Sequence, residues 1–119
     1  MKQNQNHPLI SIGPKMIWSL LIATYNRPES LCRSLRFATA QSRPPAEVIV
    51  VDASDRWEEH RTMVLQQVAA HAPAAILWRY ERARVRGLAT QRNQAIALAS
   101  GDVLFLIDDD AFMYPDCAE

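Results

Sequence analysis

The chain of 119 residues has little of several features that define common function classes. Only three glycines are present, at positions 13, 87 and 101, so the sequence contains neither a G-x-G-x-x-G turn nor a Walker loop. Their absence argues against dinucleotide oxidoreductases and P-loop phosphotransferases, which need those loops to hold phosphate. Thirteen basic and thirteen acidic residues cancel. Bulk charge therefore gives no indication of nucleic acid or of an anionic membrane surface as a partner.

Cysteines and long apolar runs are also scarce. Cys32 and Cys117 lie far apart without metal-binding spacing, as expected for inert thiols in a reducing compartment. The longest apolar stretch, MIWSLLIA, is far shorter than the ~20 residues of a membrane span. Residues 1–16 lack the apolar core of a signal peptide and are expected to form a disordered lead-in. We therefore expect one soluble domain over residues 17–119, located in the cytoplasm or peripherally on the inner face of the membrane.

Four short apolar runs predict buried β-strands. They occupy residues 17–23, 47–51, 74–80 and 103–107. Helical patterns separate these runs, and the alternation is typical of a Rossmann-like α/β fold with a parallel sheet, right-handed crossovers and helices on both faces. In such folds, ligands bind beyond the carboxyl ends of the strands, where the strand order reverses.

Local signals suggest the limits of the three helices. Pro28 suits the first turn of one helix, and Asn26 is expected to be its N-cap. Asp55 and Glu58 resemble a capping box at the start of a second helix. A third, alanine-rich helix is expected to end before Gly101.

Three consecutive aspartates follow the fourth strand and indicate a candidate site. Asp108, Asp109 and Asp110 repel one another unless water or a cation offsets their charge. Hard carboxylate oxygens favour Mn²⁺ or Mg²⁺. On an extended segment, Asp108 and Asp110 would point the same way and share a metal, with Asp109 turned aside. The alternative is that the three acids are solvated or cap a following helix.

Other polar residues collect at the same predicted edge. The turn TYNRP offers a hydroxyl at Thr24 and a ring at Tyr25 that can stack on a base. Asp52 ends the second strand, where such folds often place an acid for ribose or base, although a turn-initiating role fits equally well. Arg92 on the third helix is a candidate for a diphosphate clamp, and the loop arginines are either part of it or a solvated surface. Those loop arginines are Arg82, Arg84 and Arg86. The histidines, including His60, lack metal or triad spacing and are expected at the surface.

The segments SLLIATYNRPESLCRSLRFATAQSRPPAEVIVVDAS and RVRGLATQRNQAIALASGDVLFLIDDDA, with their spacing, resemble the nucleotide-sugar-binding half of a family 2 glycosyltransferase with the GT-A fold. The resemblance runs from about Trp18 to Asp116. It implies inverting transfer of a sugar from a nucleoside-diphosphate sugar, most commonly a UDP-sugar, to a saccharide or other hydroxyl acceptor. It also implies Mn²⁺ or Mg²⁺ as the cofactor.

The same resemblance implies roles for individual residues. Those expected at the nucleobase are Thr24, Tyr25, Arg27 and Asp52. Arg92 would approach the base or the diphosphate. Asp108 or Asp109 would serve the ribose, and Asp110 together with Asp108 would hold the metal.

Two departures from the family pattern matter. Ala53 stands where members commonly carry a second acid, which weakens the expected base site only slightly. Members also usually continue well past the acidic motif into a half that carries the acceptor site and the general base. We expect that half to be absent from a chain ending at Glu119. No catalytic base is assigned, because the spacing of Asp116 and Glu119 makes neither a credible substitute.

Three other interpretations stay open on the sequence alone. A catalytically incomplete fragment would only bind nucleotide, and its uncovered sheet edge would favour self-association. A sugar nucleotidyltransferase also combines a parallel sheet with a divalent ion, but it normally has a glycine-rich basic loop where this chain has TYNRPES. The third interpretation is an α/β module without a ligand.

Overall fold

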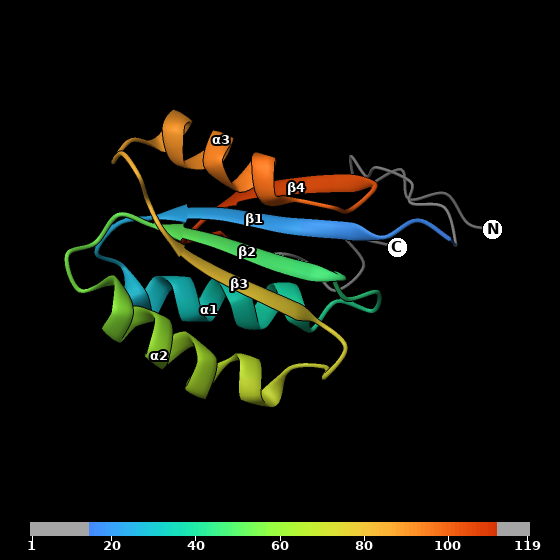
Figure 1. Cartoon of the computed structure of the whole chain (residues 1–119). Coiled ribbons are helices and arrows are strands. Elements are labelled where there is room, and N and C mark those ends of the chain that lie inside the picture. The colour runs from blue at the N-terminus through green and yellow to red at the C-terminus, as the bar shows by residue number, and fades with distance from the viewer. Residues whose placement is uncertain (1–14, 112–119) are drawn as a thin grey trace.

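A computed structural model of the chain describes residues 15–111. Within these residues, four parallel strands form one sheet in the order β3-β2-β1-β4 (Figure 1). The strands are β1 (Trp18–Thr24), β2 (Glu47–Asp52), β3 (Leu77–Arg82) and β4 (Val103–Asp108). The helices are α1 (Pro28–Thr39), α2 (Trp57–Gln67), the short 3₁₀ helix η1 (Ala69–His71) and α3 (Leu88–Leu98). The predicted parallel α/β sheet is confirmed.

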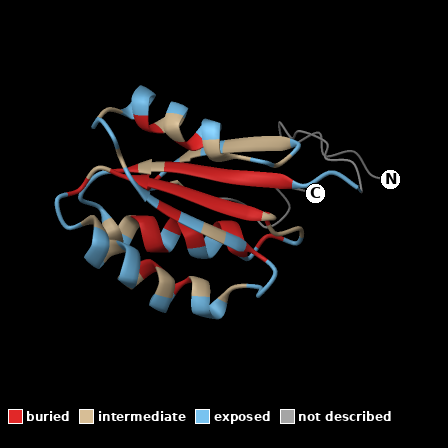
Figure 2. Ribbon diagram, viewed as in Figure 1, coloured by how far each residue is buried: buried red, intermediate tan, exposed pale blue. Residues whose placement is uncertain are grey.

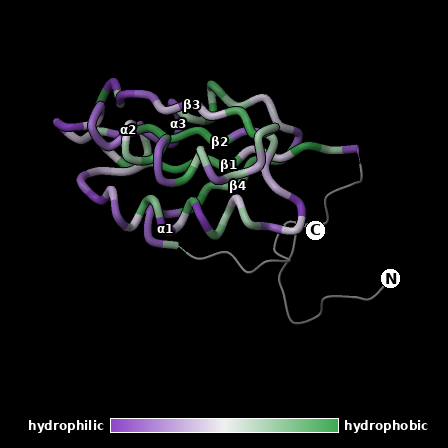
Figure 3. The backbone as a smooth tube through the Cα atoms, turned by 90° about the horizontal axis from the view of Figure 1, so that it is seen from below, coloured by the Kyte–Doolittle hydropathy of each residue, from purple (hydrophilic) through white to green (hydrophobic). Residues whose placement is uncertain are grey.

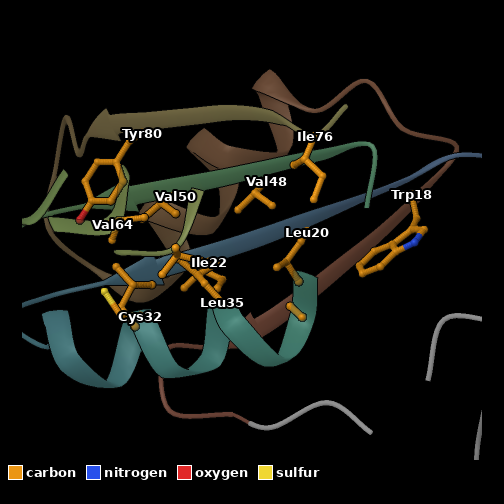
Figure 4. Close-up of a cluster of buried hydrophobic side chains, with 13 residues drawn as sticks. Trp18, Leu20, Ile22, Cys32, Leu35, Val48, Val50, Val64, Ile76 and Tyr80 are labelled. Atoms are coloured by element: carbon orange, nitrogen blue, oxygen red, sulfur yellow. The ribbon is translucent and has the colours of Figure 1, made fainter. Parts of the chain in front are cut away.

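Helices cover both faces of the sheet, because alternate strand residues point to opposite sides. Leu20 and Ile22 of β1 pack against the α1 and α2 side, where a large apolar cluster forms (Figure 4). Leu21, between them, packs on the α3 side with Ala95. In Figure 1, α1 and α2 lie below the sheet and α3 lies above it. This arrangement confirms the predicted covering of both faces.

The strand order reverses at β1. The chain runs from β1 through α1, β2 and α2 to β3 on one side of the sheet. It then crosses through α3 and places β4 on the other side of β1. The inner strands β1 and β2 are almost wholly buried, whereas β3 and β4 are more exposed (Figure 2). Hydropathy is likewise high along the strands in the middle of the sheet (Figure 3). The carboxyl ends of β1 and β4 therefore lie at the switch point where this architecture binds ligands.

The helix starts differ from the sequence predictions. The N-cap of α1 is Arg27 rather than Asn26, and no side chain caps this end. Asn26 instead adopts a left-handed backbone with φ 54°, which asparagine tolerates better than most residues. The capping box predicted from Asp55 and Glu58 does not form, because Arg56 is the N-cap of α2 and makes no side-chain capping bond.

The structure also corrects the predicted ends of β3 and α3. β3 begins at Leu77 rather than at residue 74 and continues to Arg82, because it pairs in register with all of β2. α3 ends at Leu98, so Gly101 lies beyond its C-cap. A Cβ atom on Gly101 would come within 2.3 Å of the Ser19 hydroxyl oxygen and 2.9 Å of the Ser19 backbone nitrogen. Glycine is needed there so that the α3–β4 connection can pass close to β1.

Among the helices of the described part, none combines the length and apolar character needed to cross a membrane. The expected lead-in falls almost entirely outside the described residues, as do Cys117, Asp116 and Glu119.

Candidate functional site

A cleft of about 620 Å³ opens at the carboxyl ends of β1 and β4. Three segments line it: the end of β1 with the turn that follows, the start of α3 with the loop before it, and the end of β4. Several of the predicted site residues line this cleft: Thr24, Tyr25, Arg27, Arg86, Asp108, Asp109 and Asp110. The structure therefore brings together residues up to 86 positions apart at the predicted edge of the sheet.

The acidic run does not continue the strand. β4 ends at Asp108, and the next two residues form a turn in which the Ala111 backbone nitrogen donates to the Asp108 carbonyl at 3.1 Å. Asp109 turns inward, is 9% exposed and accepts a hydrogen bond from the Thr24 hydroxyl at 2.8 Å. The Ser34 hydroxyl donates to the backbone carbonyl of Asp109 at 2.7 Å. The extended geometry predicted for this run is therefore wrong, and Asp109 instead fastens the turn to β1 and α1.

Asp108 and Asp110 point into open parts of the cleft. Their side chains are 63% and 59% exposed, and each lies near an arginine. A guanidinium nitrogen of Arg92 lies 2.9 Å from Asp108, and one of Arg27 lies 3.4 Å from Asp110. The arginines offset the repulsion within the acidic run. Exposed ion pairs contribute only about 0–1 kcal/mol, so these carboxylates can exchange the arginines for another cation at little cost.

The donor set fits a hard divalent cation that shares its coordination shell with a ligand. Mn²⁺ and Mg²⁺ prefer carboxylate oxygens, and Mg²⁺ sites typically use about one or two protein carboxylates together with water and phosphate. Asp108 and Asp110 supply such oxygens. Within the described residues, no group of three or more His, Cys, Asp or Glu side chains is arranged to hold a metal. A cation held by Asp108 and Asp110 alone would have to complete its shell with water or a ligand.

Tyr25 and Arg86 face each other at the cleft. The guanidinium carbon of Arg86 lies 4.7 Å from the centroid of the Tyr25 ring. Its Nη1 also donates a hydrogen bond to the Tyr25 hydroxyl at 2.8 Å. This contact combines a cation–π interaction with a hydrogen bond. Of the three arginines predicted in the loop, Arg82 is instead the last residue of β3, because it pairs with Asp52. Arg84 lines a separate groove beside α3, and Arg86 lines the cleft.

Gln91 is a cleft residue that the sequence reasoning missed. Its Nε2 donates to the carbonyls of Thr24 at 3.0 Å and Val51 at 2.9 Å. Its Oε1 accepts from the Gly87 backbone nitrogen at 3.0 Å. Gln91 is 3% exposed and lies four residues before Ala95, so both are on the buried face of α3. The sequence did contain a signal for Gln91, because it lies four residues before Ala95 and so on the same face of α3. A polar side chain on a buried helix face needs hydrogen-bond partners.

Asp52 lies beneath the cleft and does not line it. Its carboxylate is fully buried and accepts hydrogen bonds from the backbone nitrogen of Ser54 at 2.8 Å, the Ser54 hydroxyl at 2.5 Å and the Tyr80 hydroxyl. Burial, reinforced by the hydrogen bond to Asp52 and by its charge, raises the pKa of Tyr80. Tyr80 therefore stays protonated and able to donate.

His60 lies beside this buried network, and its Nδ1 has no hydrogen-bond partner among the described residues. Its Nδ1 lies 3.4 Å from the Asp52 carboxylate, and its side chain is only 13% exposed. The prediction that His60 is a surface residue is therefore wrong. His60 lies on the side of α2 that faces the end of β2. The apolar residues of α2 alone did not predict this orientation.

The model of the family described as Glycosyl transferase family 2 matches residues 19–119. The chain belongs to this family. Among its relatives is YwdF, an uncharacterized glycosyltransferase of Bacillus subtilis (strain 168), which is 32% identical over 97 residues. Another is WcaA of Escherichia coli (strain K12), named as a glycosyl transferase of colanic acid biosynthesis and 33% identical over 107 residues. These matches cover 82% and 89% of the chain, but the chain spans only 34% of either relative.

Solved structures of glycosyltransferases share the fold. The mannosyltransferase PcManGT of Pyrobaculum calidifontis, in complex with GDP-Man and Mn²⁺, matches with a TM-score of 0.60 and 24% identity over 82% of this chain and 28% of its own. TarS 1–349 of S. aureus, in complex with UDP, matches with a TM-score of 0.64 and 21% identity over 85% of this chain and 29% of its own. The family 2 chain therefore has the GT-A type of α/β fold that its sequence predicts.

Proposed function

We propose that this chain supplies the donor site of a glycosyltransferase that moves a sugar, with inversion, from a nucleoside-diphosphate sugar to a hydroxyl of a saccharide or other acceptor. The observation that carries the proposal is the single cleft at the strand-order reversal, which joins the turn after β1 to the acidic end of β4. Support also comes from the solved relatives, one of which is a complex with GDP-Man and Mn²⁺ and another a complex with UDP.

The cleft residues suit the parts of a sugar nucleotide. The Tyr25 ring offers a face for the nucleobase, most commonly uracil in this family, with Thr24 and Arg27 beside it. Asp108 or Asp109 accepts hydrogen bonds from the ribose hydroxyls. Arg92, close to Asp108 at 2.9 Å, carries positive charge to the side where a diphosphate would lie.

Asp110, with Asp108, would hold a Mn²⁺ or Mg²⁺ ion. When bound, such an ion supplies Lewis-acid stabilisation of the charge that develops on the departing nucleoside diphosphate. Arg27 and Arg92 hold these two carboxylates when no other cation pairs with them. When a metal ion takes their place, both arginines become available to phosphate oxygens. The same groups would therefore serve both the empty and the loaded cleft.

The acceptor site and the general base are not assigned to the described residues. The chain spans about a third of its relatives, and we propose that the rest of the machinery corresponds to the part of those proteins that it does not match. The alternative is a chain that only binds nucleotide. We also place the protein in the cytoplasm or at the inner face of the membrane. The buried free thiol of Cys32, whose pKa burial raises, fits a reducing compartment.

Calorimetric titration of UDP and GDP in the presence of Mn²⁺ tests the metal assignment. We expect Asp110→Ala to weaken nucleotide binding by about tenfold or more, because it removes a metal ligand. Asp102→Ala is the matched control, since Asp102 is also an exposed aspartate but lies at the amino end of β4. Equal affinities for the wild type and Asp110→Ala would refute the assignment.

A further inference from the structure

The buried carboxylate of Asp52 has no free oxygen to offer to a ligand. One oxygen accepts from both the backbone nitrogen and the hydroxyl of Ser54. The other accepts from the Tyr80 hydroxyl and faces the His60 ring at 3.4 Å. With an exposed fraction of 0%, Asp52 has no contact with the cleft. A direct bond to a nucleobase would require this network to break first, which would leave buried donors without partners.

The network nevertheless reaches the cleft through Ser54. The Ser54 hydroxyl donates to Asp52 and accepts a hydrogen bond from the backbone nitrogen of Asn26 at 2.7 Å. Asn26 is the residue with positive φ, and it lies between Tyr25 and Arg27, which both line the cleft. Left-handed backbone is disfavoured for residues other than glycine. The bond from the Asn26 amide to Ser54 stabilises this conformation and so sets the directions of the two neighbouring side chains.

We infer that Asp52 is a positioning residue, which fixes the nucleotide-binding turn through Ser54 rather than contacting the nucleobase. The inference rests on the proposed function, because it concerns the same cleft. Asp52 orients the Ser54 hydroxyl by accepting its hydrogen bond, which leaves the lone pairs of the hydroxyl oxygen directed at the Asn26 amide. The charge on Asp52 strengthens both bonds of this chain, since hydrogen bonds to ionised acceptors are stronger than neutral ones.

A double-mutant cycle on nucleotide affinity tests this route. The variants are Asp52→Asn, Ser54→Ala and the two combined, each titrated with the tighter-binding of UDP and GDP in Mn²⁺. Ser54→Ala is expected to weaken binding about five- to tenfold, and Asp52→Asn to weaken it in the wild type but to add less than about twofold in the Ser54→Ala background. If Asp52 touches the base itself, Asp52→Asn costs the same in both backgrounds. That result, or wild-type affinity in Ser54→Ala, overturns the inference.

A matched control separates positioning from loss of stability. Ser19, like Ser54, is a buried serine whose hydroxyl donates to a buried carboxylate, that of Glu47, but it lies at the opposite end of the sheet. Ser19→Ala is expected to lower stability without changing nucleotide affinity. Hydrogen exchange provides a readout that needs no nucleotide, because Ser54→Ala should selectively lose protection at the Asn26 amide. Unchanged protection there also overturns the inference. Failure of the wild type to bind any nucleotide would instead refute the proposed function on which it rests.

Discussion

At the scale of single residues, Gln91 joins three pieces of backbone at the base of the cleft. It donates to the carbonyls of Thr24, the last residue of β1, and of Val51 in β2, and it accepts from the amide that precedes α3. The Thr24 carbonyl also accepts from the Ala53 backbone nitrogen at 3.1 Å, so Gln91 adds a second bond there while its own buried amide group is satisfied. Gln91 thereby fixes the start of α3 against the two strands that carry the cleft.

Replacing Gln91 with leucine should therefore be costly. The change removes one bond from each of two carbonyls and leaves the half-buried Gly87 amide without its side-chain partner, and we expect the free energy of unfolding to fall by about 1–3 kcal/mol. Gln94 is the control, because it makes similar bonds to the Arg82 carbonyl and the Arg84 amide in an exposed position. Gln94→Leu should cost less than about 1 kcal/mol, since water can replace those partners. Urea denaturation of both variants measures these two changes. Equal losses of unfolding free energy in Gln91→Leu and Gln94→Leu would contradict the role of Gln91.

Cleft residues were predictable where they follow strands and unpredictable where distant partners orient them. Asp108, Tyr25 and Thr24 were placed at this edge of the sheet because each lies at or next to the end of an apolar run, and all three line the cleft. The inward turn of Asp109 depends on Thr24, 85 positions away, and no local pattern encodes that contact. The same holds for Asp52, whose burial depends on β3 and α2 packing around the end of β2.

At the scale of elements, Glu47 ties the amino end of β2 to its neighbours. Its carboxylate accepts from the Ser19 hydroxyl of β1 at 2.7 Å and from the hydroxyl of Ser100, after α3, at 2.9 Å. Burial alone would raise the pKa of Glu47, but the hydrogen bonds from Ser100 and Ser19, helped by the charge of Arg79, outweigh it and lower that pKa. The ionised form therefore stabilises the fold.

This shift predicts a pH-dependent stability. Because the folded-state pKa lies below the ordinary value of 4.5, the contribution of Glu47 is fully present above 4.5 and disappears as pH falls through the lowered pKa. Glu47→Gln should be less stable than the wild type by about 1–2 kcal/mol at pH 7, and the gap should close in acid. Glu58→Gln, at an exposed site on α2, serves as the control. Urea denaturation from pH 7 down into acid checks the prediction. A stability difference between the wild type and Glu47→Gln that does not change with pH would contradict it.

Helices and strands were predictable as elements, because each apolar run or stripe has a face to bury. Their limits were less so. The TYNRP turn and the start of α1 depend on the bond from Asn26 to Ser54, and the length of β3 depends on its pairing with β2. Neither partner is adjacent in sequence, so local capping and propensity rules placed these ends one to three residues away.

At the scale of the whole molecule, the two strands that form the edges of the sheet within residues 15–111, β3 and β4, differ in character. The β3 edge has the sequence LWRYER, whose charges discourage pairing with another strand. The β4 edge has the sequence VLFLID, which is apolar until its last residue, and Leu106 is 40% exposed. An apolar edge strand of this kind is a template for pairing with a second copy.

We therefore expect the chain to self-associate through β4. Sedimentation velocity over a range of concentrations should show dimers or larger species, and Leu106→Lys should shift the protein toward monomer. Leu77→Lys on β3 is the matched control and should leave association unchanged. A stable monomer at every concentration would exclude this expectation, and an equal effect of the two lysines would show that β4 is not the contact.

The central claim is that the cleft binds a nucleoside diphosphate together with a divalent cation. The most direct measurement is calorimetric titration of UDP, and then of GDP, into the wild-type chain with Mn²⁺ and again with EDTA. We expect saturable binding of one of these nucleotides in Mn²⁺ that EDTA weakens by about tenfold or more, because a metal ion held by Asp108 and Asp110 would need the phosphate to complete its shell. Equal binding in EDTA, or no binding of either nucleotide in Mn²⁺, would contradict it.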